Sequence, residues 1–236
     1  MLNRVDTKYV MPCSLLTRFL EQLTEDYLIL VAQGQRSHSY QTLYFDTPSW
    51  AMYLMHHNGR GTRVKVRQRH YLGSGAAYWE VKRRTNRQRT LKDRFPLPAA
   101  GLASFPEPSL GIDPCHGAEL VPRTWTFFER LTLVNLERRE RVTVDSQLSF
   151  CKAERDPIFQ QWPQTTEFRR PRHPACIVEI KRGAAREPSP AAQALRSLHL
   201  MPASFSKYCI GSALLWPQLK QNRFKPTLRT LGDLSE

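Results

Sequence analysis

One strand-like segment restricts the fold of this chain more than any other. In "GTRVKVRQRHY" (61–71), the alternation of side chains along a strand places cations on one face and valines on the other. The cations are Arg63, Lys65, Arg67 and Arg69. Neighbours on that face, about 7 Å apart, repel each other by about 2 kcal/mol at an effective dielectric of ~20. The segment therefore predicts a face that is either screened by water or bound to an anionic group.

The whole chain repeats this excess of positive charge. Its 236 residues contain 35 Lys and Arg against 21 Asp and Glu, a formal charge of +14. Between Arg60 and Arg94, 12 Lys and Arg accompany only Glu80 and Asp93. A hydrophobic content of 41% is typical of a folded, soluble protein. The charge indicates an anionic partner, which is nucleic acid, an acidic membrane surface or a polyphosphate-like ligand.

Other features argue against membrane insertion, secretion and metal sites of the zinc type. No apolar run is long enough to span a bilayer, and the first residues lack the apolar stretch of a signal peptide, so we expect a cytoplasmic protein. The five cysteines are odd in number and form no CxxC pair, and we expect them to be reduced core thiols. His56 and His57 are interpreted as the end of a helix rather than as metal ligands.

The remaining pattern predicts mostly antiparallel strands with a few amphipathic helices, which is an α+β domain. We expect a helix over 11–27, a second that begins at Thr47 and Pro48, and a third capped by Ser189. The expected domain covers 1–218, and 219–236 is expected to be a loosely attached C-terminal tail. Irregular segments are expected over 85–88, 96–122 and 156–174, and strands over 2–11, 39–46, 61–71, 78–84, 89–95, 125–134, 139–150 and 175–183.

Charged and apolar faces recur in the other expected strands. Glu80 and Lys82 share one face of their strand, and Glu179 and Lys181 share one face of theirs, while apolar residues occupy the opposite faces. Closing such a sheet predicts an eight-stranded antiparallel β-barrel tunnel with a charged interior, flanked by the helices. Converging arginines and lysines suit a chain of phosphates. Glu179 is either a salt-bridge partner or a ligand of Mg²⁺ or Mn²⁺.

Eight segments, in order, resemble a known family. The chain is similar to the VTC (vacuolar transporter chaperone) domain, the polyphosphate polymerase branch of the triphosphate tunnel metalloenzymes (CYTH-like), from about Asn3 to Gly211. The segments are "NRVDTKYV", "LYFDTP", "RVKVRQRHY", "YWEVKRR", "LKDRF", "FERLTLVNLERRERVTVD", "IVEIKRG" and "FSKYCIG".

The resemblance implies a metal-dependent polyphosphate polymerase, which transfers the γ-phosphate of ATP onto a growing inorganic polyphosphate chain in a basic tunnel. Glu179 is the implied ligand of Mn²⁺ or Mg²⁺. Arg63, Lys65 and Lys181 are added as substrate contacts because they share the faces of the motif residues. The residues expected to be catalytic are Arg67, Arg69, Lys82, Arg141 and Lys207, and those expected to bind substrate are Lys8, Lys92, Arg130, Arg63, Lys65 and Lys181.

The chain departs from the resembled family in places. Asp6 stands where the superfamily usually has glutamate. The inositol-phosphate-sensing domain and membrane segments of eukaryotic relatives are missing, so this polypeptide is not expected to thread its product across a membrane. The expected partners are ATP and inorganic polyphosphate rather than nucleic acid. A membrane-protein partner, and recruitment to the inner face of a membrane, stay open.

Two alternative functions remain. The first is an inorganic triphosphatase on the same fold, with water as the acceptor. The second is a non-catalytic module that binds polyphosphate or another polyanion, whose affinity would fall steeply with salt. The carboxylates Glu80 and Glu179 argue against the second, because a pure polyanion binder gains nothing from acids on its basic faces.

Overall fold

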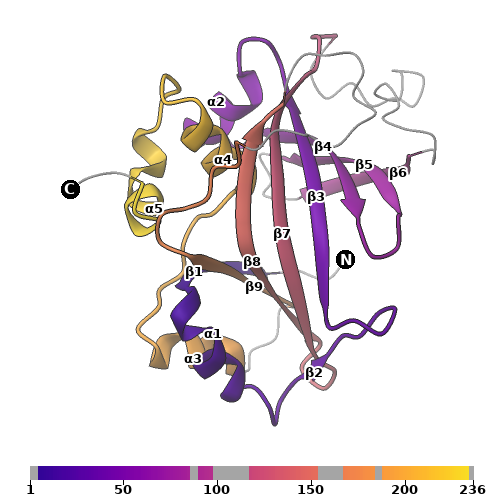
Figure 1. Ribbon diagram of the computed structural model, residues 1–236, viewed down its shortest axis with the longest axis vertical. Helices are drawn as coiled ribbons and strands as arrows, with labels where there is room; N and C mark the ends of the chain where they lie inside the picture. The colour runs from indigo at the N-terminus through magenta and orange to yellow at the C-terminus, as the bar shows by residue number, and fades with distance from the viewer. Residues whose placement is uncertain (1–4, 86–89, 98–116, 154–166, 184–187, 234–236) are drawn as a thin grey trace.

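The computed structural model describes residues 5–85, 90–97, 117–153, 167–183 and 188–233. The described chain is mostly strand, and short helices lie between and after the strands (Figure 1). The elements are β1 (Val5–Pro12), η1 (Cys13–Leu15), α1 (Leu16–Glu21), β2 (Leu28–Ile29), β3 (Ser37–Asp46), α2 (Ala51–His57), β4 (Arg63–Tyr71), β5 (Ala77–Arg84), β6 (Thr90–Pro96), β7 (Val121–Asn135), β8 (Glu140–Lys152), β9 (Ala175–Arg182), α3 (Pro190–Ser197), α4 (Lys207–Leu215), η3 (Asn222–Phe224) and α5 (Lys225–Thr230).

One antiparallel sheet contains all the described strands. Its order is β1-β9-β8-β7-β3-β4-β5-β6, and the short β2 pairs with β7 beside this path. The predicted α+β tunnel architecture, with eight strands in the main path, is confirmed. The predicted closure of the sheet into a barrel is not confirmed, because β1 and β6 form no ladder with each other in the described segments. Like charge opposes their approach, since Lys8 of β1 lowers the pKa of Lys82, which lies on β5 opposite β6.

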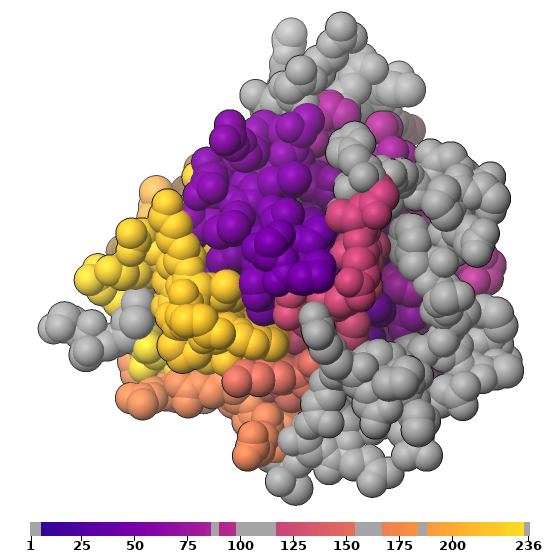
Figure 2. Space-filling model, turned by 90° about the horizontal axis from the view of Figure 1, so that it is seen from above, coloured from indigo at the N-terminus to yellow at the C-terminus, as the bar shows by residue number. Residues whose placement is uncertain are grey.

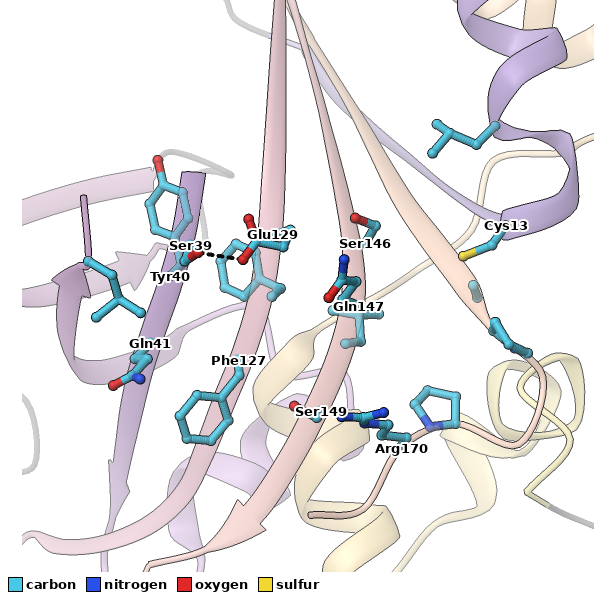
Figure 3. A pocket seen from close by; sticks show the side chains of 17 residues that line it. Cys13, Ser39, Tyr40, Gln41, Phe127, Glu129, Ser146, Gln147, Ser149 and Arg170 are labelled. Carbon is cyan, nitrogen blue, oxygen red and sulfur yellow. Dashed lines mark hydrogen bonds between the residues drawn. The ribbon is translucent and has the colours of Figure 1, made fainter. Parts of the chain in front are cut away.

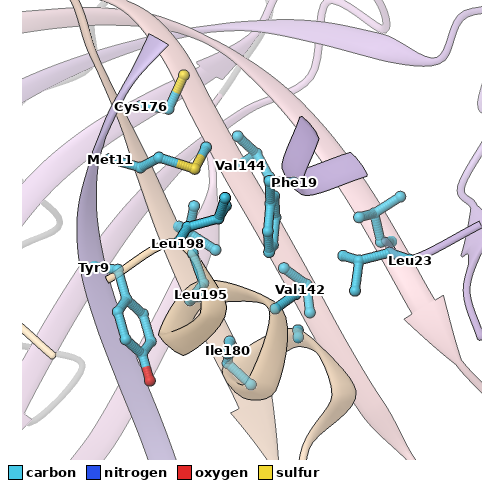
Figure 4. Close-up of a cluster of buried hydrophobic side chains, with 14 of the residues drawn as sticks. Tyr9, Met11, Phe19, Leu23, Val142, Val144, Cys176, Ile180, Leu195 and Leu198 are labelled. Atoms are coloured by element: carbon cyan, nitrogen blue, oxygen red, sulfur yellow. The ribbon is translucent and has the colours of Figure 1, made fainter. Parts of the chain in front are cut away.

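The apolar face of β1, β8 and β9 is covered by α1 and α3, as the sequence predicts. Alternate residues of these strands point away from the charged face and pack against both helices (Figure 4). Burial of these side chains supplies the hydrophobic stabilisation of this half of the sheet. The cluster includes Tyr9 and Met11 of β1, Val142 and Val144 of β8, Val178 and Ile180 of β9, Phe19 of α1, and Ala194 and Leu195 of α3.

Helix α4 packs on the opposite, charged face of the sheet. The hydroxyls of Ser212 in α4 and Thr124 in β7 share a hydrogen bond of 2.8 Å. Gly211 lies against the ring of Phe150 in β8, where no side chain would fit. The helix is buried on almost all sides from Tyr208 to Ala213. It therefore covers part of the surface that an open tunnel would leave to solvent.

The second helix begins later than Thr47 and Pro48, where it was expected. It starts at Ala51, after Trp50 in the left-handed region at φ 62°. The carboxylate of Asp46, at the end of β3, accepts hydrogen bonds from the amides of Met52 and Tyr53 at 2.9 and 2.8 Å. A buried carboxylate that accepts from two amides of the first turn satisfies them better than the Thr47 hydroxyl, which accepts from the amide of Ala51.

The helix predicted over 11–27 is shorter in the structure. Met11 and Pro12 still belong to β1, where they lie opposite Cys176 and Ala175 of β9. The ladder to β9 outweighs local helix propensity there, because it satisfies the backbone of Met11 while burying its side chain. Residues 22–26 form turns after α1.

The C-terminal segment is not loosely attached, contrary to expectation. Leu228 of α5 and Leu231 are 1% and 0% exposed and pack in one cluster with Ile210 of α4. Seen from above, residues near the C-terminus (yellow) lie against the segment that contains β3 and α2 (purple; Figure 2). The Tyr208 hydroxyl of α4 donates to Asp46, which joins the same two regions.

Some expectations fall outside the described residues. These are most of the irregular segments at 85–88, 96–122 and 156–174, and the last residues of the tail. Among the helices of the ranges above, none is long and apolar enough to cross a membrane.

The contact between α4 and β8 predicts the effect of Gly211→Ala. The new methyl group would lie 2.4 Å from Cδ1 of Phe150, so the helix must shift. We expect the free energy of unfolding to fall by about 1–3 kcal/mol, despite the higher helix propensity of alanine. Urea denaturation measures it. Gly183→Ala is the matched control, because its new methyl group meets no atom within 4 Å, and equal stability of both variants would contradict the packing.

Candidate functional site

The predicted cations share one face of the sheet. Residues directly opposite one another in an antiparallel pair point to the same side. Lys8 lies opposite Glu179, and Arg67 lies opposite Glu80. Continued across the sheet, this register places the predicted residues on the face that α4 covers, and α4 adds Lys207. They are Lys8 of β1; Arg63, Lys65, Arg67 and Arg69 of β4; Lys82 of β5; Lys92 of β6; Arg130 of β7; Arg141 of β8; and Glu179 and Lys181 of β9.

Glu80 is the counter-ion of the cations on β4 and β6. Its side chain is 1% exposed and lies 2.6 Å from Arg67 Nη2 and 2.5 Å from Lys92 Nζ. Burial alone would raise the pKa of this carboxyl, but Arg67, Arg69 and Lys92 lower it to about 2. Glu80 therefore holds cations in place. Its presence on a basic face does not by itself argue for catalysis, which corrects the expectation from the sequence.

Asp145 is a second counter-ion, which sequence reasoning did not select. Both of its oxygens accept from Arg130, at 2.6 and 2.7 Å, and one also accepts from Lys207 at the start of α4. Burial would raise the pKa of Asp145, but Lys207 and Arg130 hold it well below its usual range. The carboxylate thereby joins β7, β8 and α4. The sequence contained a signal for this role, because Asp145 lies four positions after Arg141 and therefore on the same face of the strand.

Aromatic rings support the same arginines. Tyr40 and Phe128 stack at 5.1 Å with 2° between their planes. The guanidinium carbon of Arg130 lies 5.1 Å from the centre of the Tyr40 ring, and that of Arg69 lies 5.6 Å from it. Such contacts favour a cation over a ring face and limit its orientations. Sequence reasoning did not select Tyr40, which lies opposite Phe128 and Tyr71 on the charged face.

The phenol of Tyr44 belongs to the site as well. Arg67 Nη1 donates to its oxygen at 3.1 Å. Burial would raise the pKa of Tyr44, but Arg67, Arg69, Lys65 and Lys207 together lower it to about 8. The residue lies two positions from Thr42, which accepts from Arg69 Nε at 3.3 Å. The face of β3 that carries both residues therefore orients the arginines of β4.

Two lysines of the site, Lys8 and Lys65, form no ion pair with a carboxylate among the residues that the structure describes. Lys8 donates to the carbonyl oxygen of Phe205 and Lys65 donates to the hydroxyl of Ser206, each at 3.0 Å. Burial, with Lys8 and Lys82 nearby, lowers the pKa of Lys65 to about 8. The burial of Lys65 without an ion pair costs free energy, which an incoming anion would recover. This part of the surface is therefore suited to bind one.

Two predicted arginines, Arg63 and Arg141, lie opposite other cations. Arg63 is opposite Arg84 at the start of β4, and burial, with Arg84 and Arg223, lowers its pKa. Arg141 is exposed and lies opposite Lys181. Neither arginine has an acidic partner in the described part of the chain, so both can meet a ligand without breaking an ion pair.

Glu179 is the residue whose chemistry fits a divalent cation. Its carboxylate accepts from Lys181; burial would raise its pKa, but Lys8, Lys181 and Arg130 lower it to about 2. Within the described ranges, no three His, Cys, Asp or Glu side chains gather into a metal site. Mg²⁺ and Mn²⁺ are often held by one or two carboxylates, with phosphate oxygens and water as the other ligands. The donor set fits an ion that arrives with a phosphate substrate.

Comparisons with known proteins agree with this geometry. The profile of the VTC domain matches residues 3–111 and 115–216. The chain belongs to the VTC domain family. No curated protein matches the sequence.

Solved structures resemble the VTC domain described here in fold. HpAC1 from Hippeastrum, whose structure is described as revealing a dominant triphosphatase activity, aligns over 90% of this chain and 96% of its own at 12% identity, with a TM-score of 0.52. A protein from Vibrio parahaemolyticus aligns over 88% of this chain and 97% of its own at 12% identity, with a TM-score of 0.46. The likeness to HpAC1 agrees with the triphosphate tunnel fold.

The counter-ion role of Glu80 predicts that Glu80→Gln lowers stability. We expect a loss of about 2–3 kcal/mol at pH 7, less than for a fully buried pair because Lys92 is partly exposed. With a folded pKa of about 2 against 4.5, the contribution is present above pH 4.5 and disappears as the pH falls toward 2. Chemical denaturation at several pH values measures it.

A matched control for Glu80→Gln is Glu129→Gln. Glu129 also lies on a central strand but accepts only from the hydroxyls of Ser37 and Ser39. We expect it to cost less than Glu80→Gln. Suppose that Glu80→Gln were as stable as the wild type at pH 7 and lost the same free energy of unfolding as the pH falls. Glu80 would then not be the counter-ion described.

Proposed function

We propose that this VTC domain is a metal-dependent polyphosphate polymerase, which transfers the γ-phosphate of ATP onto a growing chain of inorganic polyphosphate and releases ADP. The observation that supports the proposal is the shared inner face, where cations from both ends of the sheet and from α4 surround Lys8 and Lys65, whose hydrogen bonds go to neutral oxygens. A linear series of phosphates supplies negative charge along such a surface, whereas a compact anion meets only part of it.

In this proposal, the arginines hold the phosphates in a fixed orientation. Glu80 and Tyr44 each accept one hydrogen bond from Arg67, and Asp145 holds Arg130 through two. Both guanidinium groups are therefore oriented before the substrate arrives. Phosphoryl transfer depends mainly on positioning and on neutralisation of charge, so groups that need no reorganisation contribute most.

The unpaired lysines complete the proposed binding surface. Lys8 and Lys65 surround the segment 205–206 that precedes α4, and their bonds there are to neutral oxygens. Phosphate oxygens would replace those weak partners with charge-assisted hydrogen bonds. Glu179 would hold Mn²⁺ or Mg²⁺, and such an ion, when bound, neutralises charge on phosphate oxygens.

A second candidate function is hydrolysis of inorganic triphosphate. The observation that favours it is the dominant triphosphatase activity described for HpAC1, a protein with the same fold. Both functions use the same cations and differ in the acceptor, which is water for hydrolysis and a terminal phosphate for polymerisation.

One assay separates the two functions. The purified protein is incubated with ATP and Mn²⁺, and in parallel with tripolyphosphate and Mn²⁺. Long polyphosphate on a gel, with one ADP released for each phosphate unit incorporated, supports the polymerase. Release of phosphate from tripolyphosphate without polymer supports the hydrolase and contradicts the polymerase. Binding of tripolyphosphate with neither product would leave a polyanion-binding module.

Arg67→Ala is expected to weaken tripolyphosphate binding by about 1.5–3 kcal/mol, the free energy of a charge-assisted hydrogen bond. Glu179→Gln is expected to remove metal-dependent turnover while metal-free tripolyphosphate still binds. Calorimetry and the product assay measure these effects. Arg229→Ala, an exposed residue of α5, is the matched loss of one positive charge. Equal losses of tripolyphosphate affinity in Arg67→Ala and Arg229→Ala would mean that Arg67 contributes only its positive charge.

The lowered lysine pKa values predict how binding depends on pH. Lys65 and Lys181 titrate at about 8 in the free protein, so both are charged at pH 7. The affinity for tripolyphosphate should decrease as the pH rises through 8, because the lysines lose their charge. Lys65→Arg keeps the charge and should move the decrease to higher pH. The ligand's own titration affects both proteins equally, so identical pH profiles would contradict the assignment.

A further inference from the structure

We propose that Cys13 and Cys176 are a disulfide-forming pair, which joins the edge strand β1 to β9 when a peroxide is present. Their sulfur atoms lie 3.3 Å apart. The backbone holds them there: the amide of Cys13 donates to the carbonyl oxygen of Pro174 at 3.0 Å, and Met11 lies opposite Cys176 in the ladder. A disulfide bond of about 2.05 Å requires only a small approach of the two sulfurs.

The two thiols differ in access to solvent. Cys176 is 0% exposed and belongs to the apolar cluster under α1 and α3 (Figure 4). Cys13 is half-buried and lines a pocket of about 680 Å³ between β3, β7, β8 and the segment before β9 (Figure 3). A small oxidant can therefore reach Cys13 and not Cys176.

The surroundings also decide which thiol reacts first. Burial, and the neighbouring Cys13, raise the pKa of Cys176 far above its usual range. The attacking species is the thiolate, so a thiol that stays protonated and covered reacts slowly with solutes. Cys13 is then the residue that is oxidised, and Cys176 is the residue that resolves it.

The chemistry balances with hydrogen peroxide as the oxidant. The Cys13 sulfur attacks one peroxide oxygen, the O–O bond breaks, and the products are a sulfenic acid and one water. The Cys176 sulfur then attacks the Cys13 sulfur, the S–O bond breaks, and a second water leaves with the Cys176 proton. The two thiols lose two electrons and two protons, and the peroxide is reduced to two waters. A dithiol such as dithiothreitol reverses the step by thiol–disulfide exchange.

The bond would change the attachment of an edge strand that carries site residues. β1 is at one end of the sheet and pairs only with β9 among the described strands. It carries Lys8, which lies opposite Glu179. A link between residues 13 and 176 closes a long loop of chain, and cross-links that close long loops restrict the unfolded state most. Oxidation should therefore stabilise the fold.

The test uses the full chain with Cys115→Ser, because Cys115 lies outside the described residues. Hydrogen peroxide should remove two titratable thiols, lower the intact mass by two hydrogens, and produce a linked peptide that contains Cys13 and Cys176. The melting temperature should rise by about 5–10 °C. Dithiothreitol should reverse all four changes. Thiol counting and mass spectrometry do not depend on which phosphate compound binds the tunnel, so the result is separate from the proposed function.

Matched variants make the outcome specific. Cys13→Ser should abolish the linked peptide and the rise in melting temperature, and Cys176→Ala should do the same while leaving Cys13 open to further oxidation. Cys151→Ser should respond like the parent protein, because among the described cysteines only Cys13 and Cys176 have sulfurs in contact. Unchanged thiol counts in the parent, or sulfinic acid on Cys13 without a link to Cys176, would overturn the proposal.

Discussion

Repulsion between like charges on one face of the sheet is the constraint on which this structure depends. Cations that line adjacent strands need either buried acids or an external anion to offset that repulsion. Glu80 and Asp145 supply the acids for Arg67 and Arg130, and each acid is almost fully buried. The hydrogen bonds of Lys8 and Lys65 go to neutral oxygens, although Lys8 also lies opposite Glu179 and lowers its pKa. Acids therefore balance the positive charge of this face closely in one region and less completely in another.

Helix α4 links the stability of the fold to the arrangement of the site. The three residues at its start meet three strands: the Phe205 carbonyl contacts Lys8, the Ser206 hydroxyl contacts Lys65, and the Lys207 side chain reaches Asp145. Farther along the helix, Tyr208 donates to Asp46, which caps α2. Changes in the packing of α4 against β8 will therefore move lysines on β1 and β4. Residues 205–208 thereby tie together β1, β3, β4 and β8, which lie far apart in the sequence.

Alternation was the part of the sequence that carried the most information. Strict repeats such as Val64–Lys65–Val66–Arg67 predicted the strand and its inner face, and the capping pair Ser189–Pro190 predicted α3 correctly. Sequence reasoning missed α4 because its apolar residues surround the helix and show no stripe. It placed the start of α2 too early because Asp46, part of a strand, caps the helix from a distance. Asp145 and Tyr40 were passed over since their partners come from other strands, and pairing partners are not visible in a single strand's pattern.

The unpaired ends of the sheet have a mechanical consequence. In a fully hydrogen-bonded cylinder, strand number and stagger determine the circumference. Here the described parts of β1 and β6 leave a lengthwise seam, with Lys8 on one side and Lys82 and Lys92 near the other. Within the described residues, no ladder between β1 and β6 fixes the width of this seam. The cations on its two sides repel one another, and an anion between them would offset that repulsion.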